Sequence, residues 1–148
     1  MQQQSATIRR LVDDDRPDWF ALWQAYCDFY RTRIDAETSA TTFSRLCAGD
    51  GMVGLVAEER VGAVVGFAHL VLHKSTWATT DCCYLEDLYV VPQYRGSGVA
   101  KQLVTRVYAE ADACSVGKVY WHTQEFNAPA RSLYDTLARR TSLVVYRR

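Results

Sequence analysis

The sequence predicts a single α/β domain whose central sheet is mixed, contains a parallel portion and is flanked by helices. The chain has 148 residues, of which 49% are hydrophobic, and this is enough for one domain with its own core. Segments with strand and helix periodicity follow one another in the order β-α-α-β-β-β-α-β-α-β. The β-α-β-α-β second half is typical of a sheet with parallel strands. Because the sequence shows no repeat and no Pro/Gly-rich linker, residues 1–148 are interpreted as one domain.

The first part of the chain changes from a strand pattern to a helix pattern. A short β-like run covers Thr7–Val12, and Asp13–Asp15 with Pro17 indicates the start of a helix. This helix carries an aromatic stripe at spacings of three, four and seven residues: Trp19, Leu22, Trp23, Tyr26, Phe29 and Tyr30. Such a stripe packs in a core, and its edge could alternatively form the wall of a substrate pocket. A second helix is expected over Ser39–Ala48, ending near Gly49.

Three strands are expected next. Met52–Glu59 and Val61–Leu72 are rich in β-forming residues and are joined by a tight turn. Cys82–Val91 is almost continuously apolar, which is typical of a central strand buried on both faces. Two adjacent carboxylates, Glu86 and Asp87, interrupt this run. Since side chains alternate along a strand, we expect these two on opposite sides of the sheet, each needing a partner.

The remaining elements alternate between helix and strand. Gly98–Cys114 has apolar residues on one face and predicts a helix, and Val119–Thr123 predicts a strand. Asn127 is expected to cap the next helix, with Pro129 in its first turn. Leu143–Tyr146 is expected to form a closing strand.

Charge and cysteine content argue against several classes of protein. The 17 basic and 17 acidic residues give a formal net charge of zero, so no general attraction to nucleic acid or to an anionic membrane is expected. No apolar run approaches the roughly 20 residues that cross a bilayer, and the N-terminus lacks the apolar region of a signal peptide. The cysteines and histidines show no zinc-ligand spacing. We therefore expect a cytoplasmic protein with no metal, no disulfide framework, no nucleic-acid partner and no membrane partner.

The most informative segment is the loop that joins Cys82–Val91 to the helix at Gly98. It contains two glycines, Gly96 and Gly98, two positions apart. Glycines let the backbone approach a ligand closely, and the N–H groups at a helix start favour an anion such as a diphosphate. A P-loop would need Gly-Lys-Ser/Thr and a dinucleotide-binding loop would need G-x-G-x-x-G, and the sequence has neither. A dinucleotide oxidoreductase is therefore disfavoured.

Two segments resemble signatures of the GCN5-related N-acetyltransferase (GNAT) superfamily. Gln93-x-x-Gly96-x-Gly98, after the strand Tyr84-Leu85-Glu86-Asp87-Leu88-Tyr89-Val90, resembles its acetyl-CoA signature. Asn127-x-x-Ala130-x-x-Leu133-Tyr134 resembles its downstream cofactor segment. The strand is similar in particular to the spermidine/spermine and yeast histone/polyamine acetyltransferase-like group. The resemblance implies the GNAT fold over nearly the whole chain, with acetyl-CoA as the acyl donor.

The resemblance also implies roles for individual residues. Loop residues would offer backbone N–H groups to the pyrophosphate of acetyl-CoA: Arg95, Gly96, Gly98, Val99 and Ala100. The backbone of Leu88 and Val90 would pair with the pantetheine arm as an added strand does, and Asn127 would contact the same arm. Tyr134 would lie near the sulfur and act as the general acid that protonates the departing thiolate.

Glu86 matches the position of a proposed general base in the polyamine-acetylating relatives. An alkylammonium has a pKa near 10.4 and a free glutamate one of about 4.3, so direct proton abstraction is unfavourable at neutral pH. We expect Glu86 to orient the cation and to accept its proton through a water molecule. Asp87, His122, Cys82 and Cys83 are interpreted as structural side chains.

The sequence departs from the family pattern in two places. The family often closes its last helix with Gly-Phe, where this chain has Ser142-Leu143, and the usual final strand is missing or very short. The acceptor side would then be incomplete in a monomer. The edge near Leu143–Tyr146 is therefore expected to be covered in a homodimer.

The sequence thus predicts an N-acetyltransferase that transfers acetyl from acetyl-CoA directly to a primary amine. A small amine or polyamine is favoured as acceptor, and a protein lysine is a further candidate. No Ser or Cys with a paired base is evident, which favours direct transfer over a covalent intermediate. The alternative is a non-catalytic acyl-CoA-binding or sensing module on the same fold. Such a module would need neither Glu86 nor Tyr134.

Overall fold

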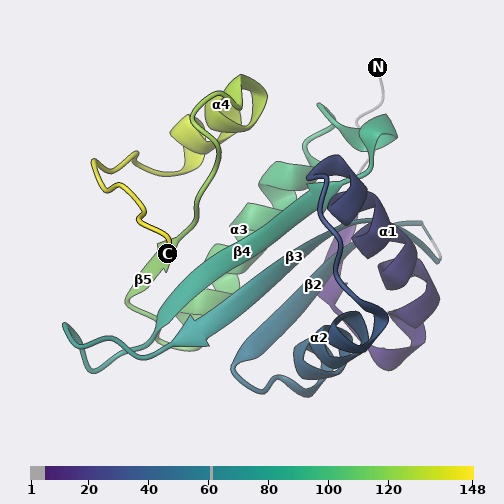
Figure 1. Ribbon diagram of the computed structural model, residues 1–148, viewed down its shortest axis with the longest axis horizontal. Helices are drawn as coiled ribbons and strands as arrows, with labels where there is room; N and C mark the ends of the chain where they lie inside the picture. Colours follow the sequence, from purple (N-terminus) through teal and green to yellow (C-terminus); the bar gives the residue numbers. More distant parts are fainter. Residues whose placement is uncertain (1–5, 61) are drawn as a thin grey trace.

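The computed structural model describes residues 6–60 and 62–148; Met1–Ser5, and Val61 where we expected a strand to begin, lie outside the described residues. Within them, five strands form one mixed sheet in the order β1-β2-β3-β4-β5, with helices on both faces (Figure 1). The first four are antiparallel, and β5 runs parallel to β4. Their bounds are β1 (Thr7–Arg10), β2 (Met52–Glu59), β3 (Ala63–His73), β4 (Cys82–Val90) and β5 (Lys118–Tyr120). The predicted α/β fold with a parallel portion is confirmed.

The helices begin and end at recognisable caps. They are α1 (Arg16–Phe29), α2 (Ala36–Ala48), α3 (Val99–Ala113) and α4 (Ala128–Leu137), with short 3-10 turns at Asp13–Asp15 and Pro92–Tyr94. α2 begins three residues before the predicted Ser39, because the Asp35 carboxylate accepts the Thr38 N–H at 2.6 Å and forms the N-cap. Gly49 ends this helix with a φ of 68°, a backbone conformation that favours glycine.

The core has two layers, one on each face of the sheet. One layer lies between the sheet and α3 and includes Leu55, Ala68, Leu70, Cys83, Leu103 and Val107. The other lies under α1 and α2 and includes Trp19, Trp23, Phe43, Leu46, Val56 and Phe67. The aromatic stripe of α1 divides between the two interpretations offered by the sequence. Trp19 and Trp23 are core residues, whereas Phe29 and Tyr30 at the end of the helix are 54% and 47% exposed.

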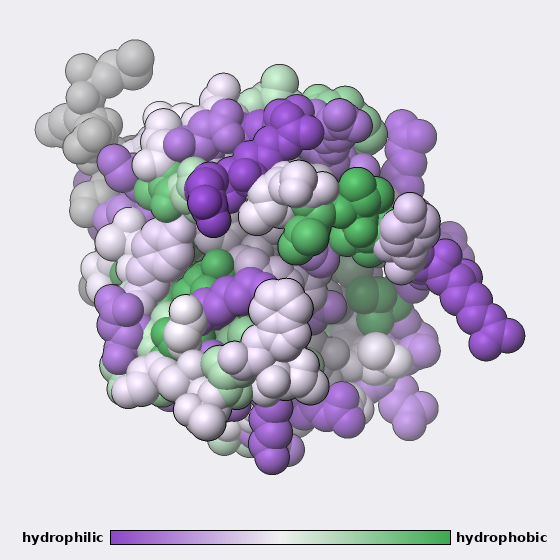
Figure 2. All heavy atoms as spheres, turned by 90° about the vertical axis from the view of Figure 1, so that its left-hand side faces the viewer, coloured by the Kyte–Doolittle hydropathy of each residue, from purple (hydrophilic) through white to green (hydrophobic). Residues whose placement is uncertain are grey.

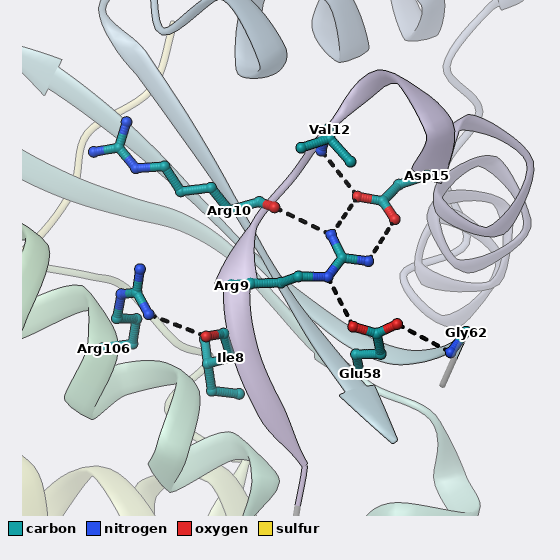
Figure 3. Close-up of polar contacts among 8 residues, drawn as sticks. All are labelled: Ile8, Arg9, Arg10, Val12, Asp15, Glu58, Gly62 and Arg106. Atoms are coloured by element: carbon teal, nitrogen blue, oxygen red, sulfur yellow. Dashed lines mark hydrogen bonds and ion pairs between the residues drawn. The ribbon is translucent and has the colours of Figure 1, made fainter. Parts of the chain in front are cut away.

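An ionic network connects β1, β2 and the turn before α1 (Figure 3). The Arg9 guanidinium donates to both carboxylate oxygens of Asp15, at 2.7 and 2.8 Å, and to Glu58 at 2.9 Å. Asp15 also accepts the Val12 N–H at 2.9 Å. The hydrogen bonds from Arg9 hold the pKa of Asp15 below its usual value. This network fixes the direction in which α1 starts, and so directs its aromatic stripe onto the sheet.

β4 is buried on both faces at its two ends, as the sequence predicts, whereas Glu86 in its middle is exposed and part of its edge is open. β5 pairs with β4 only along Cys82–Tyr84, so within the described residues the later part of β4 has an open edge. The register with β3 also shifts, from His69 opposite Asp87 to Leu70 opposite Leu85. Glu86 is therefore the extra residue of a β-bulge. A bulge bends its strand and interrupts the alternation of side chains, so alternation does not separate Glu86 from Asp87 as expected.

The C-terminal part of the chain also differs from the prediction. The closing strand expected at Leu143–Tyr146 is wrong: these residues form no strand, and their side chains are 67–94% exposed. A strand needs a partner edge, and β5, only three residues long, offers little of one. β5 ends before His122 and Thr123, which we had placed in it. α4 stands apart from the sheet (Figure 1), and the Tyr108 hydroxyl on α3 holds its end by donating to the Leu137 carbonyl at 2.8 Å.

Among the residues that the structure describes, no helix has the length and apolar character required to cross a membrane.

Candidate active site

The loop before α3 is shaped to receive an anion. Gly96 and Gly98 have φ angles of 79° and 94°, and a Cβ built on either would meet no atom within 4 Å. Their backbone is therefore open to a ligand. The N–H groups of Arg95 and Ser97 donate within the loop, at 3.2 and 3.3 Å. Those of Gly96 and Gly98 have no backbone acceptor among the described residues.

The start of α3 adds further donors to this loop. Gln102 is the residue whose N–H bonds back to Gly98, at 3.0 Å, so the N–H groups of Val99 and Ala100 precede the first helical bond. They point out of the helix start together with its positive dipole end. This donor set suits the pyrophosphate of acetyl-CoA, and four of the five predicted loop residues contribute to it. Arg95 is the exception in this conformation, because its N–H is already used.

The Arg95 side chain instead connects the loop to α1 and β4. Its guanidinium carbon lies 5.2 Å from the centre of the Phe29 ring and 5.8 Å from that of Tyr89. Its Nε donates to the Val90 carbonyl at 3.1 Å. The loop is thereby fixed against the exposed end of the aromatic stripe.

The open edge of β4 lies next to this loop, and the Arg95 side chain is hydrogen-bonded to its Val90 carbonyl. The Val91 N–H donates to Val65 in β3 at 2.9 Å. Because hydrogen-bonding directions alternate along an antiparallel strand, Tyr89 and Asp87 also direct their backbone toward β3. Leu88 and Val90 then face the open side, where no described strand pairs with them. A chain-like ligand with amide groups, such as pantetheine, fits this edge as an added strand would.

Asn127 is the N-cap of α4, and Tyr134 lies within this helix. The Asn127 side chain accepts the Ala130 N–H at 3.4 Å, so the predicted cap is confirmed. The Tyr134 ring packs edge-on against Trp121, with ring centres 5.4 Å apart. Burial, with a smaller contribution from Tyr30, raises the pKa of Tyr134. Its hydroxyl therefore keeps its proton at neutral pH and can act as a donor.

The two adjacent carboxylates of β4 lie in different environments. Glu86 is exposed on the bulge, and its pKa is raised by partial burial and by the charge of Asp87. The Asp87 side chain is 14% exposed; it accepts the Tyr26 hydroxyl at 2.6 Å and lies 2.9 Å from His69 Nδ1. This agrees with the structural interpretation of Asp87 and supplies the partners that the sequence did not identify.

The exposed end of α1 brings these groups together. Burial and then the charge of Asp87 raise the pKa of Tyr30. Tyr30 in turn makes a smaller contribution to the raised pKa of Tyr134. Tyr26 connects Asp87 to this end of the aromatic stripe: its hydroxyl donates to Asp87 at 2.6 Å, and its ring centre lies 4.9 Å from that of Tyr30. Figure 2 views the molecule from the side of α4 and the C-terminal segment, and shows a recess near the centre of that face with separate hydrophobic patches around it. His122 lies outside β5 and pairs its Nδ1 with the Tyr84 hydroxyl at 3.2 Å.

Three residues of this region were not among those singled out from the sequence for the site. Tyr26 and Tyr30 belonged to the aromatic stripe, and their position at its C-terminal end was the available signal. His69 gave no signal, because its partner Asp87 lies 18 residues away on another strand.

The chain is similar in sequence to known acetyltransferases. The D-amino-acid N-acetyltransferase HPA3 of Saccharomyces cerevisiae is 32% identical over 143 residues, which cover 95% of this chain and 89% of the yeast protein. The thialysine N-epsilon-acetyltransferase of Sus scrofa is 31% identical over 83 residues, covering 56% of this chain and 48% of that protein.

A comparison with solved structures and a match to a family model agree with these sequence similarities. The aminoglycoside N-acetyltransferase AAC(6')-Iy, solved in complex with CoA, superposes with a TM-score of 0.83 at 19% identity, covering 97% of this chain and 93% of the other. At this identity the likeness shows a shared fold. The model of the acetyltransferase (GNAT) family matches residues 8–138, which include the open edge of β4, the glycine loop and α4. The chain therefore belongs to the acetyltransferase (GNAT) family.

Proposed function

We propose that the chain transfers the acetyl group of acetyl-CoA directly to the primary amine of a small molecule. The observation that carries this proposal is the open edge of β4, which has an anion-binding loop at one end and Glu86 beside it. Tyr134 lies on α4, and burial raises the pKa of its phenol. A module that only bound acyl-CoA would need the loop and the edge, but neither the Tyr134 phenol nor Glu86.

The proposed reaction needs proton transfers away from the amine nitrogen and a proton transfer to the departing sulfur. Glu86 takes a proton from the acceptor ammonium through a water molecule, and its raised pKa brings it closer to the neutral range in which a general base works well. The amine nitrogen then forms a bond to the thioester carbonyl carbon. The carbon–sulfur bond breaks as the tetrahedral adduct collapses, and the electron pair leaves on sulfur. The positively charged nitrogen of the adduct gives its second proton to water, Tyr134 gives its proton to the thiolate and regains one from solvent, so the products are the amide and CoA.

The acceptor is proposed to be a small cationic amine, with polyamines included. The carboxyl groups of Glu86 and Asp87 provide acidic character, and the rings of Tyr26 and Tyr30, with centres 4.9 Å apart, provide faces that attract a cation. The relatives named for D-amino acids, thialysine and aminoglycosides support a primary amine without selecting one of them.

A panel of amines tests this proposal. Purified protein is given acetyl-CoA with spermidine, a D-amino acid, thialysine, an aminoglycoside or a lysine peptide, and thiol release is measured against enzyme-free and Glu86→Gln controls. We expect at least one small amine to accelerate release. If none does, while calorimetry shows that acetyl-CoA binds, the acyl-CoA-binding module is the better description.

We also infer a homodimer in the cytoplasm. Leu143–Tyr146 exposes four apolar side chains of strand-forming types, and a second copy would cover such a surface. The five cysteines are free thiols, as is usual in a reducing compartment. Light scattering should give twice the mass of 16.8 kDa, and Val144→Asp should shift the protein toward monomer. A monomer at high micromolar concentration would contradict the dimer.

A further inference from the structure

His69 is the buried histidine of β3, and both of its ring nitrogens have partners. Its side chain is 3% exposed. The indole Nε1 of Trp19 lies 3.0 Å from His69 Nε2, and Asp87 Oδ2 lies 2.9 Å from His69 Nδ1. The ring also stacks on Phe67, with centres 4.3 Å apart and planes inclined by 3°. The imidazole is therefore held from three sides.

These partners determine where the imidazole carries its proton. An indole N–H can only donate, so His69 Nε2 must be the acceptor and cannot carry a proton. The ring is then the neutral tautomer with its proton on Nδ1, and this N–H donates to Asp87. The Tyr26 hydroxyl donates to the other oxygen of Asp87 at 2.6 Å, and burial followed by the charge of Asp87 raises the pKa of Tyr26. The carboxylate of Asp87 thus receives one hydrogen bond on each oxygen.

The contact between His69 and Asp87 lies where β4 bends. These two residues form the last regular pair before the bulge, and the register then shifts to Leu70 opposite Leu85. Glu86, the bulged residue, is adjacent to Asp87. The side-chain hydrogen bond therefore joins β3 and β4 next to the residue that is proposed to accept the proton of the amine.

We propose that His69, fixed by Trp19, is a positioning residue for the acceptor side of the site: it holds the Asp87 carboxylate in place and keeps Glu86 of the bulge directed at the amine. This inference rests on the proposed acetyl transfer. His69 has no contact with solvent and need not exchange protons during the reaction. Its role is to supply one N–H in a fixed direction. The hydrogen bond from the Trp19 indole to Nε2 disfavours the tautomer that carries its proton on Nε2.

Two substitutions separate positioning from packing. His69→Asn keeps a donor near the place of Nδ1, whereas His69→Leu removes it and fills the same space. The matched control is Ser39→Ala, which removes the acceptor of another buried indole, that of Trp23, at 3.0 Å. It disturbs the same layer of the core without touching Asp87. The readouts are kcat/KM for the acceptor and KM for acetyl-CoA, measured on variants whose folding is confirmed by circular dichroism.

We expect His69→Leu to lower the acceptor kcat/KM by about tenfold or more, as for a lost hydrogen bond to a charged group. The acetyl-CoA KM should stay within about twofold, His69→Asn should recover most of the loss, and Ser39→Ala should leave the acceptor kinetics unchanged. Wild-type kinetics in a folded His69→Leu variant would overturn the proposal. So would equal losses in the Leu and Asn variants accompanied by weaker acetyl-CoA binding.

Two further measurements keep the inference testable in other cases. If His69→Leu does not fold, Tyr26→Phe takes its place, since it removes the other donor to Asp87, and it should lower the acceptor kcat/KM severalfold; unchanged kinetics would count against the network. Nitrogen-15 NMR of the imidazole should show a protonated Nδ1 and a bare Nε2. A proton on Nε2 would overturn the inference whether or not any amine is acetylated, whereas a wild-type protein inactive on every amine would refute the proposed function alone.

Discussion

Replacing Tyr134 by phenylalanine should lower kcat by about 10- to 100-fold, or about 1.4 to 2.7 kcal/mol in the barrier. The departing thiol has a pKa of about 8.5, so its thiolate leaves tolerably without help, and a general acid is then worth the low end of its usual range of roughly 10²–10⁴. Phenylalanine preserves the edge contact with Trp121 at 5.4 Å. Folding and acetyl-CoA affinity should therefore change little.

The assay measures kcat with both substrates saturating, after single-turnover experiments have shown that chemistry limits the rate. The control is Tyr108→Phe, which removes the hydroxyl that donates to the Leu137 carbonyl at 2.8 Å and tethers the end of α4. It should cost about 1 kcal/mol of stability and leave kcat within about threefold. Equal losses of kcat in both variants would trace the effect to movement of α4. Wild-type kcat in Tyr134→Phe would reduce this residue to a packing role.

Three other substitutions test the loop, the bulge and the ionic network. Gly98→Asp should abolish acetyl-CoA binding in calorimetry, because it places negative charge in the loop that is expected to bind the pyrophosphate. The control Gly62→Asp, at an equally open glycine with a φ of 101°, should bind acetyl-CoA normally. Tight binding by Gly98→Asp would rule out this loop as the pyrophosphate site. Glu86→Gln should lower the acceptor kcat/KM about tenfold. It should also remove the acid limb of the pH–rate profile, which we expect above the usual range of a glutamate because burial and Asp87 raise the pKa of Glu86; an unchanged limb would belong to another group. Arg9 lowers the pKa of Asp15, so this carboxylate stabilises the fold above its unfolded pKa and loses that contribution as the pH falls through the folded one. Asp15→Asn should therefore lower the free energy of unfolding in urea by about 2 kcal/mol at pH 7, and by progressively less as the pH falls through the folded pKa of Asp15. An equal loss at every pH would contradict the pairing.

The parts of the fold that depend on local sequence were predictable. The loop with Gly96 and Gly98 followed from glycine spacing between a strand and a helix, and both glycines have the positive φ angles that other residues avoid. Asn127 was expected to cap α4, and its side chain does so. The Asp35 cap would have corrected the start of α2, since an N-cap is also a local signal.

The parts that depend on contacts between distant residues were not predictable. The bulge at Glu86 arises from the register of β3 against β4; the adjacent carboxylates Glu86 and Asp87 interrupt the apolar run of β4 but do not by themselves specify a bulge. The partners of Asp87 come from α1 and β3, 61 and 18 residues away. Leu143–Tyr146 has the composition of a strand but no edge to pair with, because pairing depends on the neighbour as much as on the segment itself.

The short pairing of β5 with β4 has a consequence for handling the protein. The open edge of β4 can pair with an extended chain, so an unfolded segment or a foreign peptide can add to the sheet there. Preparations kept without the acyl donor should therefore aggregate sooner on warming than preparations saturated with it. The donor protects in two ways, by mass action on the folded state and by filling the place that another chain would take.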